Sequence, residues 1–136
     1  MKEIVVDSNV FIASLIDSDP FNQRGREFIN KLEKGEYQFH LSIIVPIEVS
    51  CNIARKVGNE EGLETKDILE NWIKENKIKV HSLDQKRMKE AEKYGILFKL
   101  KGMDAIIVQL AIELDKPLAT FDKEIISRAT KVKFLE

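Results

Sequence analysis

Short apolar stretches alternate with longer amphipathic stretches along the whole sequence, and this alternation constrains the fold more than any other feature. The short stretches have the length and composition of β-strands and cover 3–6, 38–44, 78–81, 117–120 and 132–135. Consecutive apolar residues, as in Ile4-Val5-Val6, suit a strand that is covered on both faces. Strands that alternate with helices form parallel sheets. We therefore predict an α/β fold, a three-layer α/β/α sandwich with a central, mostly parallel sheet.

The stretches between these strands carry the signals of helices. The predicted helices are 9–15, 20–34, 46–57, 65–76, 84–100, 103–114 and 123–129, with 58–62 as a loop. Asn9 and Asp84 occupy N-cap positions, and Pro46 stands at a first helical position. Cys51 lies on an apolar stripe of its helix and is predicted to be a small core residue.

Length, charge and cysteine content limit the classes of protein to which this chain can belong. With 136 residues, 43% of them hydrophobic, 1–136 is predicted to form a single globular domain. The formal charge of −1 excludes an adaptor that is held on nucleic acid by bulk charge alone. The single cysteine cannot form an internal disulfide, the apolar runs are too short to cross a membrane, and the first strand leaves no room for a leader. We expect a cytoplasmic protein with no membrane partner.

Four acidic residues stand apart from the others, most of which alternate with lysines along solvent-exposed helix faces. Asp7 follows the first strand, Glu48 lies in the first turn of a helix, Asp104 opens a strongly amphipathic helix, and Asp122 follows the fourth strand. Taken singly, each is explained as a helix cap or a first-turn acid near the positive end of the helix dipole. Asp7 fits this explanation least, because it interrupts a buried apolar run at a strand end.

Taken together, the four acids indicate a binding site. In open parallel sheets, ligands bind beyond the carboxyl ends of the strands. Carboxylates that converge there repel one another, and a hard cation such as Mg²⁺ or Mn²⁺ relieves that repulsion. Such a site can activate water for attack on a phosphodiester. His40 and His81 lack the spacing of metal ligands, and the sequence has neither a Gly-rich phosphate loop nor a plausible Ser–His pair.

Four short motifs occur in an order that resembles a known family. They are Val-Asp-Ser-Asn-Val at 6–10, Ile-Val-Pro-Ile-Glu-Val at 44–49, Gly-Met-Asp-Ala-Ile-Ile at 102–107 and Leu-Ala-Thr-Phe-Asp at 118–122. Over nearly the whole chain, the sequence resembles PIN-domain ribonucleases, most closely the short VapC-like toxins of prokaryotic toxin–antitoxin modules. The resemblance implies a PIN-like fold and a Mg²⁺- or Mn²⁺-dependent endoribonuclease that serves as the toxin of a type II pair.

The resemblance also implies roles for particular residues. The acids that would hold the metal and carry catalysis are Asp7, Glu48, Asp104 and Asp122. Thr120 is similar to a hydroxyl residue that orients the last acid or a metal-bound water, although an ordinary strand-end threonine explains it equally well. Asn9 is similar to a polar residue that supports the site. Phe121 departs from the basic or polar residue that toxin-type members often carry there.

The partners that the resemblance implies are an RNA substrate, an antitoxin protein and a second copy of the chain. Antitoxins usually pack near the N-terminal helices, where Phe21, Phe28 and Trp72 either serve that surface or belong to the core. Three alternatives remain open: a PIN-domain RNA-processing nuclease that is not a toxin, an aspartyl-nucleophile phosphatase and a non-catalytic binding module. A phosphatase would use Asp7 as its nucleophile, but Asn9 stands where it would need a general acid.

Overall fold

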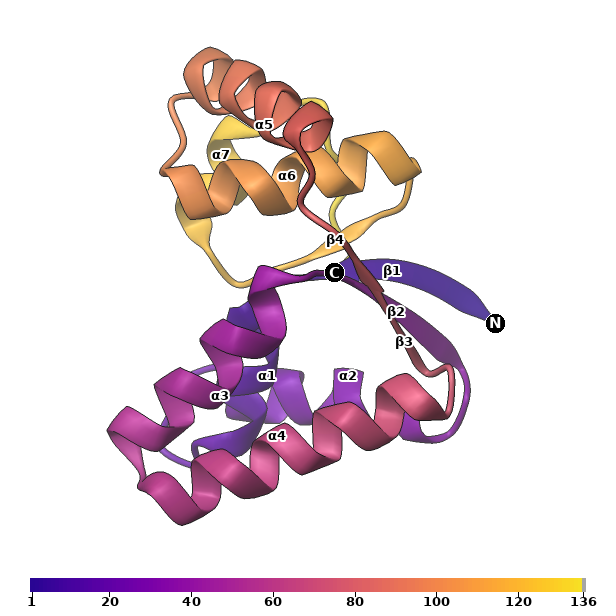
Figure 1. Cartoon of the computed structure of the whole chain (residues 1–136), viewed down its shortest axis with the longest axis vertical. Coiled ribbons are helices and arrows are strands. Elements are labelled where there is room, and N and C mark those ends of the chain that lie inside the picture. Colours follow the sequence, from indigo (N-terminus) through magenta and orange to yellow (C-terminus); the bar gives the residue numbers. More distant parts are fainter. Residues whose placement is uncertain (136) are drawn as a thin grey trace.

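The computed structural model of the chain describes residues 1–135 and is built around a central sheet. Its strands are β1 (Lys2–Val6), β2 (Tyr37–Ser42), β3 (Ile78–His81) and β4 (Leu118–Ala119). They lie in the order β3-β2-β1-β4, and all neighbours are parallel, so their carboxyl ends share one edge of the sheet (Figure 1). The predicted α/β fold with a parallel central sheet is confirmed. Glu136, the last residue of the predicted domain 1–136, lies outside the described residues.

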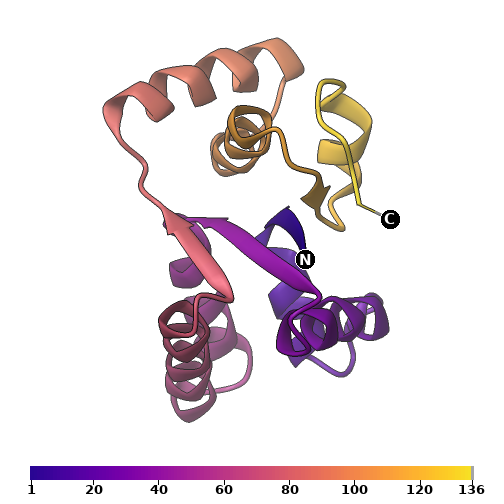
Figure 2. The ribbon, with the colours of Figure 1, turned by 90° about the vertical axis from the view of Figure 1, so that its right-hand side faces the viewer.

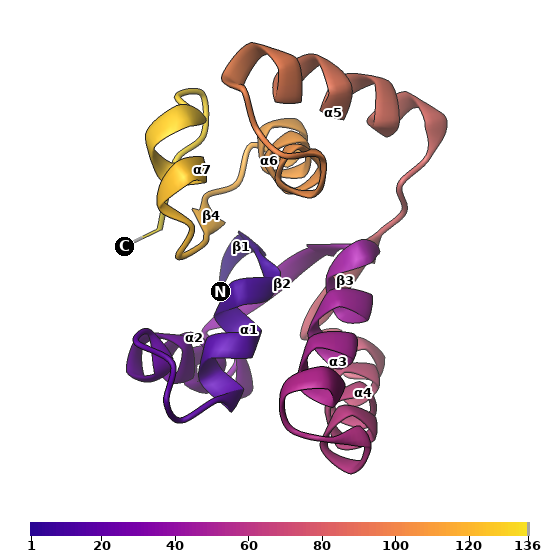
Figure 3. The ribbon, with the colours of Figure 1, turned by 90° about the vertical axis from the view of Figure 1, so that its left-hand side faces the viewer.

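Helices cover both faces of this sheet, which gives the three layers that the sequence predicts (Figures 2 and 3). One face carries α1 (Ser8–Leu15), α2 (Asn22–Glu33), α3 (Ile44–Lys56) and α4 (Asn59–Lys74). The other carries α5 (Gln85–Phe98), α6 (Gly102–Leu114) and α7 (Lys123–Arg128). Within residues 1–135, no helix combines the length and the apolar character that a membrane crossing requires.

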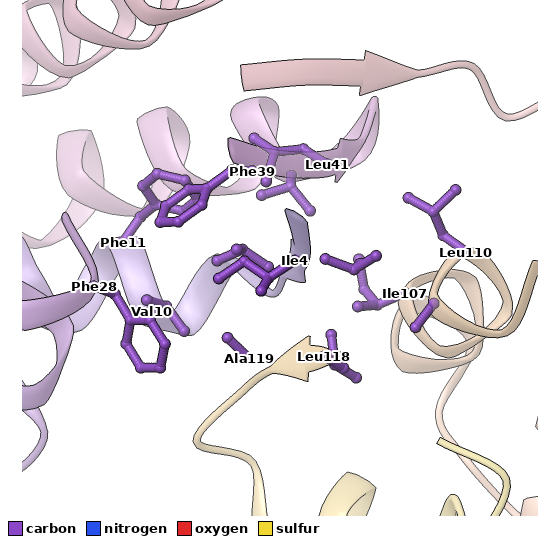
Figure 4. Packing of buried hydrophobic residues seen from close by; sticks show 14 of the residues in the cluster. Ile4, Val10, Phe11, Phe28, Phe39, Leu41, Ile107, Leu110, Leu118 and Ala119 are labelled. Carbon is purple, nitrogen blue, oxygen red and sulfur yellow. The ribbon is translucent and has the colours of Figure 1, made fainter. Parts of the chain in front are cut away.

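Strand β1 lies at the centre of the hydrophobic core. Its Ile4 is fully buried, and Phe11 of α1 meets Phe39 of β2 edge to face on one side, with ring centroids 5.7 Å apart. Ile107 and Leu110 of α6 pack from the other side (Figure 4). Burial on both faces fixes β1 as an inner strand, and this fixes the position of the residue that follows it.

The prediction that 58–62 forms a loop is wrong, because α4 begins at Asn59 rather than at residue 65. Gly58, with φ of 154°, makes the break between α3 and α4. Glu60 and Glu61 lie in the first turn of α4, where acidic side chains favour a helix start. Gly62 is a packing residue: a Cβ there would lie 2.7 Å from the Cβ of Ala54.

The boundary between β2 and α3 also differs from the prediction of a strand through residue 44. Strand β2 ends at Ser42, and α3 begins at Ile44. Pro46 is therefore the third residue of the helix rather than the first, and Glu48 is the fifth, one turn inside. Proline is tolerated there because the first turn of a helix leaves its backbone N–H groups without helical partners.

Only one of the two apolar stripes of α3 faces the core. Val45, Val49 and Ile53 are buried, whereas Ile47 is 61% exposed and Cys51 is exposed. The prediction that Cys51 is a core residue is therefore wrong. The sequence pattern offers both stripes, and only the packing of α3 against its neighbours decides which of them is covered.

The predicted last strand, 132–135, is reduced to a single parallel bridge between Leu118 and Phe134. The backbone N–H of Leu118 donates to the carbonyl of Lys133 at 2.8 Å, and that of Leu135 donates to the carbonyl of Leu118 at 2.9 Å. Strand β4 is only two residues long, so it gives this segment little backbone to pair with.

Candidate active site

Two neighbouring strands bring the first and the last of the singled-out acids to the same edge of the sheet. β1 and β4 pair in register at Val6 and Ala119. The chain turns off each strand directly afterwards, and the backbone N–H of Asp7 still donates to the carbonyl of Ala119 at 3.0 Å. Asp7 and Thr120 therefore lie side by side, although 113 positions separate them in the sequence.

Asp7 is buried, with 6% of its surface exposed, and its carboxylate is held from several directions. The backbone N–H of Ser8 donates to Oδ1 at 2.7 Å, and the Thr120 hydroxyl donates to Oδ2 at 2.8 Å. The side-chain amide of Asn9 donates to Oδ2 at 3.3 Å. Asp7 is also the N-cap of α1, so the helix-cap role predicted for each acid taken singly is confirmed for Asp7.

Asn9 links the ends of the two strands instead of capping a helix. Its Nδ2 donates to Thr120 Oγ1 at 3.2 Å, and its Oδ1 accepts from the backbone N–H of Phe121 at 3.1 Å. The prediction that Asn9 caps α1 is wrong, because the helix begins one residue earlier, at Ser8, and Asp7 takes the cap. The two sides of the amide instead connect the segment after β1 to the segment after β4.

Thr120 connects the first acid to the last. While its hydroxyl donates to Asp7, its oxygen accepts from the backbone N–H of Asp122 at 3.1 Å. Asp122 is the N-cap of α7, and its Oδ1 accepts from the backbone N–H groups of Glu124 at 2.8 Å and Ile125 at 3.3 Å. These contacts fix the backbone and the carboxylate of Asp122 relative to Asp7.

Glu48 and Asp104 approach this edge from helices on opposite faces of the sheet. Glu48 lies on α3 and Asp104 is the third residue of α6; both side chains are half-buried. The hydroxyl of Ser8 lies between two of the acids: it donates to Asp7 Oδ1 at 3.4 Å and also lowers the pKa of Glu48. Sequence reasoning did not single out Ser8, although it stands directly between Asp7 and Asn9.

The pKa values show that the four acids lie within electrostatic reach of one another. Burial, followed by the charges of Glu48 and Asp122, raises the pKa of Asp7 from 3.8 to about 6, against the hydrogen bonds from Thr120 and Ser8. Burial and the charges of Asp122 and Asp7 raise the pKa of Asp104 to about 6. Burial and the charge of Asp104 raise the pKa of Glu48.

Two further charges act on the cluster of Asp7, Glu48, Asp104 and Asp122, which we call the acid cluster. Glu124 adds to the repulsion that raises the pKa of Asp104, and Lys101 opposes it. Sequence reasoning treated neither residue as part of the site. Lys101 is the N-cap of α6, and Glu124 lies in the first turn of α7. The sequence alone does not show that either residue lies near Asp104 in space.

The donor set of the acid cluster consists of carboxylate oxygens, with a threonine hydroxyl and an asparagine amide beside them. Oxygen ligands suit hard cations such as Mg²⁺ or Mn²⁺, and a cation would relieve the repulsion that raises the pKa values of these acids. Within residues 1–135, no three His, Cys, Asp or Glu side chains are grouped closely enough to hold a metal ion by themselves.

Comparison with known protein families identifies the fold. The family model of the PIN domain matches residues 4–132. The chain belongs to the PIN domain family. A comparison with curated proteins gave no match. The family resemblance that the sequence motifs predict is thus confirmed.

Solved structures from other organisms have the same fold as this PIN domain at low sequence identity. VapC20 of Mycobacterium tuberculosis, described as a toxin that cleaves the sarcin–ricin loop, is 13% identical with a TM-score of 0.73 over 91% of this chain and 93% of its own. VapBC2 of Rickettsia felis, bound to promoter DNA, is 13% identical with a TM-score of 0.70 over 98% and 97%. A toxin–antitoxin complex from Klebsiella pneumoniae is 20% identical with a TM-score of 0.62 over 90% and 89%.

The hydroxyl of Thr120 gives this PIN domain a testable link between its first and last acids. We expect Thr120→Val to lower the free energy of unfolding by about 1–3 kcal/mol, because it removes the hydrogen-bond partner of the Asp122 backbone N–H and one of the two partners of Asp7 Oδ2 and of Asn9 Nδ2. Thr120→Ser keeps the hydroxyl and should cost clearly less. Urea unfolding of both variants measures the difference. Equal stability of the valine variant and the wild type would show that the hydroxyl has no structural part.

Proposed function

We propose that this chain is a Mg²⁺- or Mn²⁺-dependent endoribonuclease that cleaves RNA phosphodiester bonds, with Asp7, Glu48, Asp104 and Asp122 as its metal-holding, catalytic acids. The observation that carries the proposal is the mutual electrostatic reach of these four carboxylates, which come from distant segments and surround a buried Asp7 with a pKa of about 6. Structures rarely retain such repulsion without a function, and perturbed carboxyl groups of this kind concentrate at active sites.

The chemistry assigns separate tasks to the residues. When bound, the cation would activate water and offset the negative charge that develops on the phosphodiester oxygens. The carboxylate of Asp7 accepts backbone and side-chain hydrogen bonds and that of Asp122 accepts two backbone N–H groups, so both acids would hold the cation in a fixed place. Glu48 and Asp104 are half-buried and would face the cation from the two layers of helices. Mg²⁺ commonly keeps several waters and binds through few carboxylates, so the proposal needs no closed cage of protein ligands.

Thr120 would act as a positioning residue. Its hydroxyl donates to Asp7, which keeps that carboxylate in one rotamer, and its oxygen receives the backbone N–H of Asp122. The expected role was to orient the last acid or a metal-bound water, and the contact with Asp7 adds to it. The hydroxyl supports both acids, the first through its side chain and the last through its backbone.

The proposed partners are RNA, an antitoxin protein and a second copy of the chain, in the cytoplasm. The likeness to VapBC and other toxin–antitoxin structures supports the toxin interpretation. The family match over 4–132 supports one PIN-like domain over 1–136. Of the three aromatic residues considered for an antitoxin surface, Phe28 belongs to the core, with 8% of its surface exposed. Phe21, whose ring stacks on that of Phe121 at 4.7 Å, and Trp72 are half-buried and pack against the core.

An aspartyl-nucleophile phosphatase has less support. Such an enzyme needs a general acid beside its nucleophile, and Asn9 stands in that position. Asn9 uses both sides of its amide within the site and offers no acidic proton. A PIN-domain RNA-processing nuclease would use the same acids as a toxin, so the two differ only in substrate and partner.

The experiment that tests the proposal measures cleavage of total RNA by the purified chain with added Mg²⁺ or Mn²⁺ and with EDTA. We expect discrete cleavage products with either metal, none with EDTA, and recovery when excess metal is restored. Cleavage that persists at full rate in EDTA would contradict the role of the metal. Absence of cleavage of any RNA, with hydrolysis of an aryl phosphate instead, would favour the phosphatase.

A further inference from the structure

A second charged region lies beside the acid cluster and has the opposite sign. It is a shallow groove of about 530 Å³ where the end of α5 meets the end of α7. We call it the basic groove, and it is lined by Leu97, Phe98, Lys99, Arg128, Thr130 and Lys131. Three of these six residues are cations and none is an acid. Arg128 pairs with Glu124, so the uncompensated positive charges of the groove are those of Lys99 and Lys131.

The groove is held together by a contact between segments that are distant in sequence. The Arg128 guanidinium donates to the carbonyl of Lys99 at 2.7 Å, and it also pairs with Glu124 at 3.1 Å. Lys99 itself is left-handed, with φ of 56°, at the end of α5. Glycine or asparagine would be the usual choice there. A lysine at this position keeps a positive charge on the turn despite the cost in backbone strain.

The lysines of this region carry charge that acidic side chains do not neutralise. Lys99, Lys101 and Lys131 are exposed, and none forms an ion pair with an acid in the part of the chain that the structure describes. Lys131 lies over the ring of Tyr94, 5.8 Å from its centroid, which positions the ammonium without cancelling its charge. An unpaired lysine is free to contact an anion from solution.

Several other cations of the chain are already engaged. Arg26 pairs with Asp17 at 2.6 Å, and Arg87 binds Glu113 through two nitrogens, the shorter contact at 2.8 Å. Arg24 lies over the Phe121 ring. The structure thus separates cations that stabilise the fold from cations that remain available, a distinction that the sequence does not make.

Two residues link the basic groove to the acid cluster: Glu124, which pairs with Arg128 and acts on Asp104, and Lys101. Lys101 lies two residues beyond Lys99, at the N-cap of α6, and its charge acts on the carboxylate of Asp104. Figure 3 shows α7 beside the start of α6 and beside the connection between α5 and α6. A chain of positive charge therefore runs from the acids, through Lys101, to Lys99 and Lys131.

We propose that the basic groove is the binding site for the phosphates of the RNA strand on one side of the scissile bond. The inference rests on the proposed function, because it names where the substrate of that reaction lies. Without a bound metal, the negative charges of the acid cluster repel the phosphates of RNA. The affinity for the RNA strand must therefore come from positively charged side chains beside the acids. Phosphates bind lysine ammonium groups with release of counterions, and two or three such contacts also fix the direction in which the strand crosses the acids.

The test uses Lys99→Gln/Lys131→Gln, since glutamine removes the charge, remains polar and is only one atom shorter than lysine. Binding of a fluorescent single-stranded RNA is measured by anisotropy in EDTA at several KCl concentrations, so that no cleavage occurs. Loss of two contacts should reduce the slope of log K against log salt by about 1.4, and affinity at 0.1 M salt by roughly 25-fold. The matched control, Lys2→Gln/Lys34→Gln, removes two exposed lysines at the opposite edge of the sheet.

The outcomes separate this proposal from the proposed function. If RNA binding is weakened in the groove variant but not in the control, the result supports the groove as an RNA-binding site. This holds even if no RNA is cleaved and the nuclease assignment fails. Equal RNA affinity in the wild type and both variants overturns it, as does equal weakening in the control. Selective loss of duplex DNA or peptide binding, with RNA binding intact, also overturns it. With Mg²⁺ present, the groove variant should raise KM and leave kcat unchanged, since these contacts persist from the bound state to the transition state.

Discussion

Asp104→Asn is expected to abolish RNA cleavage and, at the same time, to stabilise the metal-free protein. Asparagine keeps the shape of the side chain but removes the charge that would hold the cation. Loss of residues that merely support a metal ligand typically costs 10–100-fold, so loss of a ligand should lower kcat/KM by at least about a hundredfold. The substitution also relieves the repulsion from Asp122 and Asp7 that raises the pKa of Asp104 to about 6.

The gain in stability should be modest, because Asp104 is only half-buried and solvent screens its charge. We expect about 1 kcal/mol at neutral pH in EDTA, seen as a rise in the midpoint of urea unfolding. Asp115→Asn is the matched control: Asp115 is exposed at the other end of α6, and its left-handed backbone, with φ of 51°, accepts asparagine well. This control should leave cleavage unchanged.

Asp7→Asn tests the same role less cleanly. Its carboxylate accepts from Ser8, Thr120 and Asn9, so an amide there would direct N–H groups at existing donors and disturb the local structure. Metal-dependent cleavage at undiminished rate in both Asp7→Asn and Asp104→Asn would refute the catalytic assignment of the acid cluster. Loss of cleavage in Asp104→Asn together with a loss of stability would instead indicate a structural role.

The sequence predicted the parts of the fold that depend on local pattern. The apolar run before Asp7 identified a buried strand, and the alternation of strands and helices identified a parallel sheet, which the structure has. The position of acids directly after strands led to a hypothesis about their convergence, because parallel strands end at one edge of a sheet. This hypothesis about the acids follows from the fold class alone and does not require the order of the strands.

The parts that were missed depend on which segments become neighbours. The local pattern predicts a helix cap at Asn9 and only the family resemblance suggests a supporting role in the site, because that role requires β1 to lie beside β4 and no local pattern gives the strand order. The sequence predicts a loop at Gly62. A glycine that permits a close helix contact, here with Ala54, cannot be distinguished by sequence from a glycine that ends a helix. Cys51 was placed in the core because α3 offers two apolar stripes and only packing selects one.

The stability of the metal-free protein should increase as the pH is lowered from neutral, and Mg²⁺ should reverse that trend. The pKa of Asp7 is raised from 3.8 to about 6 in the folded state, so protonation favours folding. Its contribution to stability is complete below about pH 4 and is lost as the pH rises through about 6. For this buried group, the difference corresponds to about 3 kcal/mol at 1.36 kcal/mol per pH unit. Asp104 and Glu48, with raised pKa values, act in the same direction.

His81 acts in the opposite direction and must be separated from this effect. Burial and the charges of His40 and Arg87 lower its pKa, so its contribution is present above 6.5 and is lost as the pH falls. The informative quantity is therefore the difference in unfolding free energy between the wild type and Asp104→Asn, which has the same His81. In EDTA this difference should be largest at about pH 7.5 and should shrink towards about pH 5, where the acids are protonated.

Mg²⁺ binds the ionised acids, so its stabilisation should show the reverse dependence on pH. At a hundredfold excess over Kd, the wild type should gain about 2.7 kcal/mol near neutral pH. The gain should fall towards about pH 5, because protons compete with the ion for the same carboxylates. Asp104→Asn should gain much less at every pH, whereas Asp115→Asn should follow the wild type. A gain from Mg²⁺ that is independent of pH and of Asp104 would mean that the ion binds elsewhere, and the acid cluster would then lose its proposed cation.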